Sequence, residues 1–235
     1  MTSLDGAVVL VTGANGGIGT HFVQEALSRG ATKVYASARS PKAWGDDRIV
    51  PLKLDVSDAA SIRAAAEAAT DVSILVNNAG IAPSTTSLID IDDDELRAVM
   101  ETNFFGPLAV ARAFAPALSA QGDAALIDVH SLLAWYATMG VYSVSKAALW
   151  SATNALRLEL APSGVHVVGV HVGYVDTAMA AHAAAPKVDP ADLVRQVFEA
   201  TEAGQYEVLA DDLSIQVKAG LSRPVEELYP QLLKR

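Results

Sequence analysis

Short apolar runs, alternating with longer segments of helical period, are the feature that most constrains how this chain folds. The runs AVVLVT (7–12) and KVYASA (33–38) are almost continuously apolar, which is typical of strands that a parallel sheet buries on both faces. Further runs follow the same pattern, the last of them more weakly. We therefore expect seven strands, over residues 7–12, 33–38, 48–56, 72–78, 125–130, 165–172 and 206–210.

The segments between these runs have the apolar spacing of helices. Strands and helices that alternate without a break in composition predict one doubly wound α/β domain over residues 1–235, with a mainly parallel sheet and helices on both of its faces. The Ala-rich piece at 178–187 is either a mobile lid or a helical connection. The expected helices cover residues 17–29, 58–69, 141–160 and 190–203, with a long one that starts near Asp92.

Composition excludes several classes of protein. A hydrophobic fraction of 51% with 19% charged residues supports a large buried core and excludes intrinsic disorder. A net charge of −10 without a cluster of Lys and Arg predicts no nucleic-acid partner. The chain has no cysteine, no basic segment before its first apolar run and no apolar stretch of membrane-spanning length. We therefore expect a cytoplasmic protein with no membrane partner.

The sequence TGANGGIG (12–19) lies where the first strand ends and the first helix begins. Gly13 permits the tight turn, while Gly17 and Gly19 let a pyrophosphate approach the backbone and let the helix pack close to the strand. No Gly-Lys-Ser/Thr follows, so the loop is not a P-loop. The loop predicts a Rossmann-type, dinucleotide-binding fold, with Asn15 and Ile18 also beside the cofactor.

The end of the second strand decides between the two nicotinamide dinucleotides. A carboxylate there receives the ribose hydroxyls of NAD, whereas a cation accommodates the 2′-phosphate of NADP. This chain has Ser37 and Arg39 at that point, and its next carboxylate is Asp46. We therefore expect NADP(H) as the preferred cofactor and NAD(H) as a second one. The alternative is that Arg39 only lies along the surface.

Further motifs follow in a set order: NNAG (77–80), TNFFG (102–106), and Ser131 upstream of YSVSK (142–146). With the glycine loop, these motifs resemble the single-domain branch of the short-chain dehydrogenase/reductase family over residues 5–177. The resemblance implies a catalytic tetrad of Asn103, Ser131, Tyr142 and Lys146. It also implies cofactor contacts by Asp55, Val56, Asn77, Ala79, Gly80, Tyr142, Lys146, Gly173, Val175 and Thr177.

The chain departs from the family pattern in three places. Val172-Gly173 stands where Pro-Gly is usual, and the gap between Ser131 and Tyr142 is shorter than usual. The C-terminal part after Thr177 does not resemble the common family ending. Substrate choice and assembly are therefore poorly constrained by the resemblance.

Tyr142 and Lys146 are four residues apart, so they share one face of a helix. A phenol is a poor acid or base at neutral pH, but a neighbouring ammonium favours the phenolate and lowers the pKa of the phenol. A phenol tuned in this way exchanges a proton with a carbonyl or alcohol oxygen, which Ser131 would orient. The alternative is an exposed helical pair that contributes only tenths of a kcal/mol.

Several buried polar residues have a structural and a functional interpretation. Asn103 either holds a water linked to Lys146, as the family resemblance implies, or is a structural amide bonded to neighbouring backbone. His166 and His171 face opposite sides of one strand, which argues against a shared metal, and we expect no metal site. We expect His130 to be a satisfied imidazole at a strand end.

Two functions compete on these observations. In the first, the protein moves a hydride between NADP(H) and a carbonyl or alcohol, with Tyr142 as general acid and base. Trp135, Tyr136 and Met139 would then form an apolar wall for a small ketone or aldehyde of low charge. In the second, it is a catalytically silent dinucleotide-binding regulator or scaffold, which has no need of all four tetrad residues.

The assembly is predicted from the helices that start near Asp92 and Val141. Both are apolar on more than one side, and exposed apolar helix faces often mark contacts between subunits. The family resemblance points to the same two helices. We therefore expect a homodimer or a homotetramer.

Overall fold

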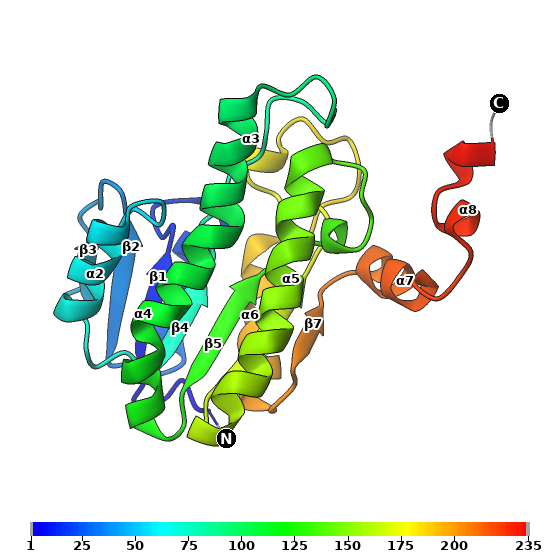
Figure 1. Cartoon of the computed structure of the whole chain (residues 1–235). Coiled ribbons are helices and arrows are strands. Elements are labelled where there is room, and N and C mark those ends of the chain that lie inside the picture. Colours follow the sequence, from blue (N-terminus) through cyan, green and yellow to red (C-terminus); the bar gives the residue numbers. More distant parts are fainter. Residues whose placement is uncertain (1, 234–235) are drawn as a thin grey trace.

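The computed structural model describes residues 2–233. One parallel sheet forms its centre, with the strand order β3-β2-β1-β4-β5-β6-β7 and helices packed on both faces (Figure 1). All seven predicted strands and the doubly wound Rossmann-type fold are confirmed. The strands are β1 Val8–Thr12, β2 Lys33–Ala38, β3 Ile49–Lys53, β4 Ile74–Asn77, β5 Ala125–Val129, β6 His166–His171 and β7 Glu207–Leu209.

The helices divide between the two faces of the sheet. Apolar side chains of α1 (Gly17–Ser28) and α6 (Pro190–Glu202) fill the core on one face. Those of α2 (Ala59–Ala68), α4 (Gly106–Gln121) and α5 (Gly140–Leu160) fill the core on the other. The central strands are buried on both faces because each face has its own helical layer.

The edge strand β3 differs from the expectation of burial on both faces. Val50 and Leu52 are half-buried, while Pro51 is exposed. Proline lacks a backbone N–H and is tolerated at the edge of a sheet, where one side of the strand has no partner strand. The apolar run at 48–56 therefore predicts a strand correctly but not its position at the edge.

The long helix expected from Asp92 is interrupted. It consists of α3 (Asp93–Met100), a π-helical turn η1 (Glu101–Phe105) and α4. The Asp92 side chain caps α3 by accepting hydrogen bonds from the backbone N–H groups of Asp94 and Glu95. The π-helical turn coincides with the TNFFG motif, and such turns are frequent at functional sites.

The C-terminal part holds elements that the sequence did not predict. The helix α7 (Asp212–Gly220) and the short α8 (Val225–Leu228) extend to the side of the sheet beyond β7 (Figure 1). The Ala-rich piece contains a short 3-10 turn, η4 (Ala178–Ala180), followed by irregular chain. The remaining short turns are η2 (Leu132–Ala134), η3 (Ala161–Ser163) and η5 (Pro230–Leu233).

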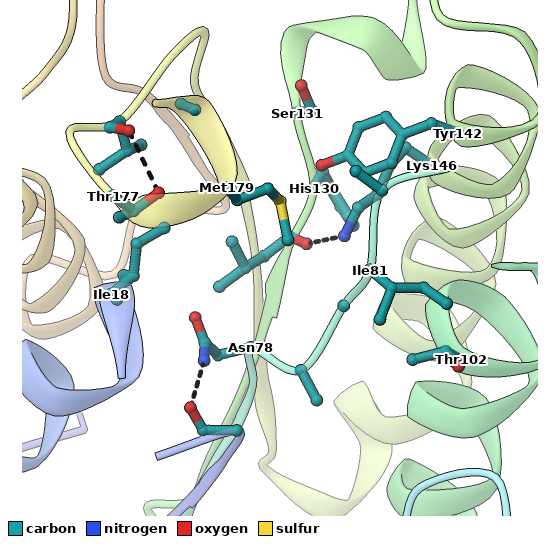
Figure 2. A pocket seen from close by; sticks show the side chains of 18 of the residues that line it. Ile18, Asn78, Ile81, Thr102, His130, Ser131, Tyr142, Lys146, Thr177 and Met179 are labelled. Carbon is teal, nitrogen blue, oxygen red and sulfur yellow. Dashed lines mark hydrogen bonds between the residues drawn. The ribbon is translucent and has the colours of Figure 1, made fainter. Parts of the chain in front are cut away.

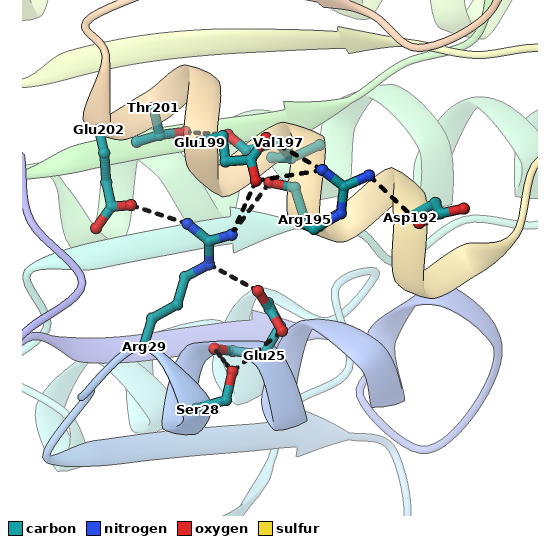
Figure 3. Close-up of polar contacts among 9 residues, drawn as sticks. All are labelled: Glu25, Ser28, Arg29, Asp192, Arg195, Val197, Glu199, Thr201 and Glu202. Carbon is teal, nitrogen blue, oxygen red and sulfur yellow. Dashed lines mark hydrogen bonds and ion pairs between the residues drawn. The ribbon is translucent and has the colours of Figure 1, made fainter.

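An ionic network connects the two helices on one face of the sheet (Figure 3). Arg29, which follows α1, lies 2.7 Å from Glu25 on α1 and 2.9 Å from Glu202 on α6. Glu199 lies 3.6 Å from Arg29 and 3.2 Å from Arg195, which joins both cations to one carboxylate. The network holds α1, whose first turn carries the glycine loop, against α6. No helix within residues 2–233 is long and apolar enough to cross a membrane.

Candidate active site

A cleft of about 1450 Å³ lies at the carboxyl ends of the parallel strands. Its wall includes the residues that follow the strand ends: Gly13 after β1, Arg39 after β2, Asn78 after β4, His130 after β5 and Val172 after β6. Strands β1 and β4 are neighbours in the sheet but not in the sequence. The chain leaves the sheet in opposite directions at this point, which is where doubly wound sheets bind ligands.

The glycine loop forms the part of the cleft next to α1. Gly13 and Gly17 have φ angles of 67° and 52°, in the left-handed region that favours glycine. A Cβ atom on Gly19 would collide with the carbonyl oxygen of Gly13, so glycine there lets the helix pack against the loop. Within the described chain no side chain caps α1 at Gly16, which leaves backbone N–H groups for an anion. This arrangement fits a pyrophosphate.

Arg39 and Asp55 line the end of the cleft beside β2 and β3. Hydrogen bonds from Ser57, and more weakly the charge of Arg39, hold the pKa of Asp55 below its usual range. Asn15 connects the glycine loop to the same end, because its amide donates to the Ser40 carbonyl at 2.7 Å. A cation and a carboxylate are therefore both present where a nucleotide ribose would lie.

Helix α5 presents Tyr142 and Lys146 to the cleft, on the side opposite Ile18 and Thr177 (Figure 2). The Nζ atom of Lys146 lies 5.7 Å from the centre of the Tyr142 ring. It donates a hydrogen bond to the Val129 carbonyl oxygen at 2.8 Å, and the side chain is only 4% exposed. The pair is therefore part of the cleft wall and not an exposed helical pair.

The protonation of this pair differs from the expectation. Burial raises the pKa of Tyr142 to about 12 and lowers the pKa of Lys146 to about 8, although the charge of Asp128 opposes the second shift. The pKa of the phenol is therefore raised and not lowered as predicted, because removal from water disfavours both charged forms. Tyr142 therefore carries its proton at neutral pH and is available as a proton donor.

Ser131 lies between β5 and η2 and lines the cleft. Its hydroxyl donates to the Val172 carbonyl oxygen at 3.2 Å and accepts from the Leu133 backbone N–H at 3.2 Å. The bond to Val172 is long for an O–H donor. A ligand oxygen in the cleft can therefore replace Val172 as the acceptor.

Asn103 lies in the π-helical turn and is fully buried behind the cleft wall. Its side-chain oxygen accepts from the Ile81 backbone N–H at 2.8 Å, and its amide donates to the Ile81 carbonyl at 2.9 Å and to Ser145 Oγ at 3.2 Å. These contacts fit the structural amide. A Cβ on Gly80 would approach both Asn103 Oδ1 and Lys146 Nζ. A relay through Lys146 stays a prediction.

Three of the predicted cofactor contacts lie outside the cleft wall. Gly19 packs against the glycine loop, and the buried Ser37 hydroxyl donates to the Val11 carbonyl at 2.9 Å. Asn77 faces α4, where its amide donates to the Pro107 carbonyl at 3.1 Å and to Asp128 at 2.9 Å. The structure brings the other predicted residues together, as the wall contains Gly13, Asn15, Gly17, Ile18, Arg39, Asp55, Val56, Ala79, Gly80, Ser131, Tyr142, Lys146, Gly173, Val175 and Thr177.

Asn78 lines the cleft in the place expected for Asn77. Its amide donates to the Thr12 carbonyl at 2.9 Å, and the Thr12 hydroxyl accepts from the Asn78 and Ala79 backbone N–H groups. These bonds attach the NNAG segment to the glycine loop. The alternation of side chains after β4 could have indicated which asparagine faces the cleft.

The apolar wall is confirmed only in part. Tyr136 and Met139 line the cleft, but the buried Trp135 does not, because its ring stacks on His171 at 3.8 Å. Residues that the sequence analysis missed complete this end of the cleft, among them Ile81 and Thr102, and Tyr174, Met179, His182 and Leu213. The last four belong to the C-terminal part or its approach, where no motif indicated them.

A doubly wound sheet with a glycine loop and a Tyr/Lys pair at its carboxyl edge defines a dinucleotide-binding oxidoreductase class. The profile of the short chain dehydrogenases matches residues 7–187. An NADP-dependent 3-hydroxy acid dehydrogenase of Schizosaccharomyces pombe is 32% identical over 193 residues, which are 75% of this chain and 74% of that protein. The chain therefore belongs to the short-chain dehydrogenase/reductase family.

Two solved structures agree with this assignment. A short chain dehydrogenase from Burkholderia cenocepacia, in complex with NADP, is 36% identical with a TM-score of 0.91, and the match covers 99% of this chain and 100% of that one. The NADPH-bound carbonyl reductase from chicken fatty liver is 30% identical with a TM-score of 0.77, covering 85% of this chain and 88% of that one.

Proposed function

We propose that this protein is an NADP(H)-dependent reductase of small, apolar ketones or aldehydes, and that Tyr142 is its general acid and base. The observation that carries the proposal is the pair of Tyr142 and Lys146 on the cleft wall, in one cleft with an uncapped helix N-terminus. The family membership supports an oxidoreductase. The rest of the proposal depends on the chemistry of these residues.

The choice of NADP(H) is supported by Arg39 and by the relatives. Arg39 offers a guanidinium that pairs with a 2′-phosphate in a bidentate manner. Both solved relatives described above hold NADP or NADPH, and the yeast relative is NADP-dependent. NAD(H) is the second cofactor of this proposal, since it lacks only the 2′-phosphate and shares every other group with NADP(H).

NADPH, held by the glycine loop and Arg39, would supply the hydride for the carbonyl carbon. Tyr142 donates its hydroxyl proton to the carbonyl oxygen, so the substrate gains one hydride and one proton and becomes an alcohol. Ser131 turns its hydroxyl from Val172 to the same oxygen and orients it. The phenolate left on Tyr142 is stabilised by the Lys146 ammonium and regains its proton from water. The oxidation of an alcohol follows the reverse path.

The proposed substrate class follows from the end of the cleft beyond Tyr142. Leu133, Tyr136, Met139, Tyr174 and Met179 line this end with apolar and aromatic surface. Such a surface favours a ligand of low charge, because apolar and aromatic side chains replace little of the hydration that a charged group would lose. We therefore assign small ketones or aldehydes without an ionised group near the carbonyl.

A screen of NADPH oxidation against ketones and aldehydes tests the proposal. The wild type should consume NADPH with at least some apolar members of the panel. Tyr142→Phe should lower kcat by about 10²–10⁴-fold, the usual effect of a lost general acid, and should keep its affinity for NADPH. Full activity of Tyr142→Phe would refute the assigned acid. Tight NADPH binding without turnover by the wild type across the panel would favour the silent scaffold.

A further inference from the structure

Four polar side chains are buried directly behind Ser131, and the proposed reaction uses none of them. Asp128 and His130 lie on β5 or just after it, His171 ends β6, and Thr153 projects from α5. All four are at most 2% exposed to solvent. A buried group of this kind has to be fully hydrogen-bonded, so its bonding pattern can be worked out one contact at a time.

The four side chains form one continuous chain of contacts that ends on the backbone of Ser131. Thr153 Oγ1 lies 2.6 Å from Asp128 Oδ2 and 2.8 Å from His130 Nε2. His130 Nδ1 lies 3.2 Å from His171 Nε2, and His171 Nδ1 lies 3.3 Å from the Ser131 carbonyl oxygen. The series has two side branches, because Thr153 Oγ1 also lies 2.8 Å from the Leu149 carbonyl oxygen and Asp128 Oδ1 accepts from the Asn77 amide at 2.9 Å.

We assign the direction of the bonds from the end of the chain at Ser131. A carbonyl oxygen can only accept, so His171 Nδ1 carries a hydrogen and, in a neutral ring, His171 Nε2 accepts. His130 must then donate from Nδ1 and accept at Nε2, so the Thr153 hydroxyl donates to His130. In this direction Thr153 Oγ1 accepts from Asp128, which carries a proton on Oδ2, whereas in the opposite direction the Thr153 hydroxyl donates to Asp128 or to the Leu149 carbonyl.

The environment agrees with neutral groups along the chain. Burial lowers the pKa of both histidines, and the charges of Lys146 and Arg157 on α5 act in the same direction. Burial also raises the pKa of Asp128, which favours its protonated form, while its contacts with Thr153 and Asn77 and the charges of Lys146 and Arg157 oppose this shift.

Two further charged groups face His171 from neighbouring elements. Glu207 on β7 lies 3.9 Å from His171 Nε2, and Lys218 on α7 forms an ion pair with Glu207. Lys218 therefore balances the charge of Glu207, and among residues 2–233 the His171 ring has no unpaired carboxylate beside it that would favour its protonated form.

The packing around the two imidazoles is shaped to hold them. A Cβ atom on Gly169 of β6 would approach His130 Cε1 to 2.9 Å, so only glycine leaves room for this ring. The Trp135 ring stacks on His171 with an interplanar angle of 17°. Each ring is therefore fixed in its plane, and the contact between them does not depend on a mobile side chain.

We propose that Asp128, Thr153, His130 and His171 form a neutral, one-directional hydrogen-bond chain, with its proton on Asp128, that holds the Ser131 carbonyl and so positions the Ser131 hydroxyl in the cleft. The chain members are positioning residues, since none of them touches the reacting atoms. The catalytic part of this inference rests on the proposed carbonyl reduction, whereas the bonding pattern does not.

Nitrogen NMR of the imidazole rings tests the bonding pattern without any assay of activity. A variant in which His21, His166 and His182 are each replaced by Gln retains only the buried pair. Near neutral pH, both rings should carry hydrogen on Nδ1 alone. Hydrogen on Nε2 alone in either ring would reverse the direction of the chain and overturn the inference. A doubly protonated His171 would also overturn the inference, because the proton would then lie on His171 and not on Asp128.

Matched substitutions test the positioning role. In His171→Asn the amide can take the place of Nδ1 and still donate to Ser131, whereas in His171→Gln it lies nearer the place of Nε2. His171→Gln should therefore lower kcat/KM about tenfold with NADPH affinity unchanged, and His171→Asn should lose much less. Thr153→Val should show the same loss, which Thr153→Ser should restore.

The outcomes separate this inference from the proposed function. Equal losses in His171→Asn and His171→Gln, at equal melting temperatures, would show that the donor to Ser131 has no positioning role. A wild type without turnover would refute the carbonyl reduction, while the NMR tautomers would still decide the hydrogen-bond chain. In an active enzyme, hydrogen on Nε2 alone in either ring would refute the hydrogen-bond chain but not the carbonyl reduction.

Discussion

At the scale of single residues, the protonated state of Tyr142 decides which chemistry the cleft can perform. A phenol with a pKa of about 12 is a proton donor at neutral pH, and it becomes a base only when its environment changes. An oxidised nicotinamide ring carries a positive charge and would favour the phenolate. Reduction of a carbonyl therefore starts from the protonated Tyr142. Oxidation of an alcohol requires that the oxidised cofactor first lowers the pKa of Tyr142.

Arg39 supplies the first prediction at this scale. Arg39→Asp should weaken NADPH binding about 10–100-fold, because it removes a charge-assisted bond to the 2′-phosphate and adds a repelling carboxylate. NADH should bind almost as well as before. Titration calorimetry with both cofactors measures the two affinities.

The control for this prediction is Arg48→Asp, which makes the same change of charge elsewhere. Arg48 pairs with Asp46 at 2.6 Å in the loop before β3 and is not part of the cleft wall. Its replacement should leave both affinities unchanged. Equal weakening of NADPH and NADH by Arg39→Asp would show that Arg39 does not read the 2′-phosphate.

At the scale of elements, the buried histidines between β5, β6 and α5 predict how stability depends on pH. Burial lowers the pKa of His171 to about 3, so between this value and about 6.5 the unfolded chain binds a proton that the folded chain does not. The contribution of His171 to stability is complete above about pH 6.5 and is lost as the pH falls. Asp128, with its raised pKa, acts with the opposite sign.

A comparison of the wild type with His171→Gln isolates this effect, since Asp128 is present in both. Between about pH 6.5 and about pH 5, the wild type should lose about 2 kcal/mol more free energy of unfolding than the variant. Urea unfolding at the two pH values measures the difference. If both proteins lose the same amount, His171 is not held neutral by the fold.

The C-terminal elements give a second prediction at this scale. The ring of Tyr229, which follows α8, stacks on Tyr136 with ring centres 5.2 Å apart, and its hydroxyl accepts from the Ala137 backbone N–H at 2.9 Å. Tyr136 lines the cleft. Tyr229→Ala should therefore raise KM for the carbonyl substrate about 3–10-fold without changing NADPH affinity. Steady-state kinetics measures both.

Tyr229→Phe serves as the matched variant, because it keeps the stacked ring and removes only the hydroxyl. Its KM should lie between those of the wild type and Tyr229→Ala. An unchanged KM in Tyr229→Ala would mean that the C-terminal elements do not shape the substrate end of the cleft.

The sequence predicted these elements unevenly, for physical reasons. Strong periodicity placed the strands and most helices, and the glycine loop and YSVSK marked both ends of the cleft. The π-helical turn at Asn103 leaves no periodic signal of its own, and the stacking of Trp135 on His171 depends on two segments that meet only in the fold. The pKa of Tyr142 was misjudged because burial cannot be read from residue spacing.

At the scale of the whole molecule, one sheet with a core on each face supports the proposal that the chain folds as a single domain. Exposed apolar side chains lie on η1 and α5. Phe105, Val144 and Leu158 are 50%, 44% and 78% exposed. Such side chains favour contacts between subunits. The homodimer or homotetramer remains a prediction, and these side chains define the surface through which the subunits would associate.

Light scattering during gel filtration tests this surface. The wild type at micromolar concentration should have a mass two or four times that of the chain, and Leu158→Glu should shift it toward the monomer. Ile215→Glu, which changes an exposed apolar residue on α7, should leave the mass unchanged. A monomeric wild type would contradict the predicted assembly.

A single-turnover comparison of two tyrosine variants tests most directly whether Tyr142 is the proton donor. Tyr136 lines the same cleft, so Tyr136→Phe removes a hydroxyl from the same surroundings without touching the proposed acid. With saturating NADPH and a ketone that the wild type reduces, Tyr136→Phe should oxidise its bound NADPH at close to the wild-type rate. Tyr142→Phe should leave it unoxidised on that timescale. Rapid oxidation of NADPH by Tyr142→Phe would contradict the account.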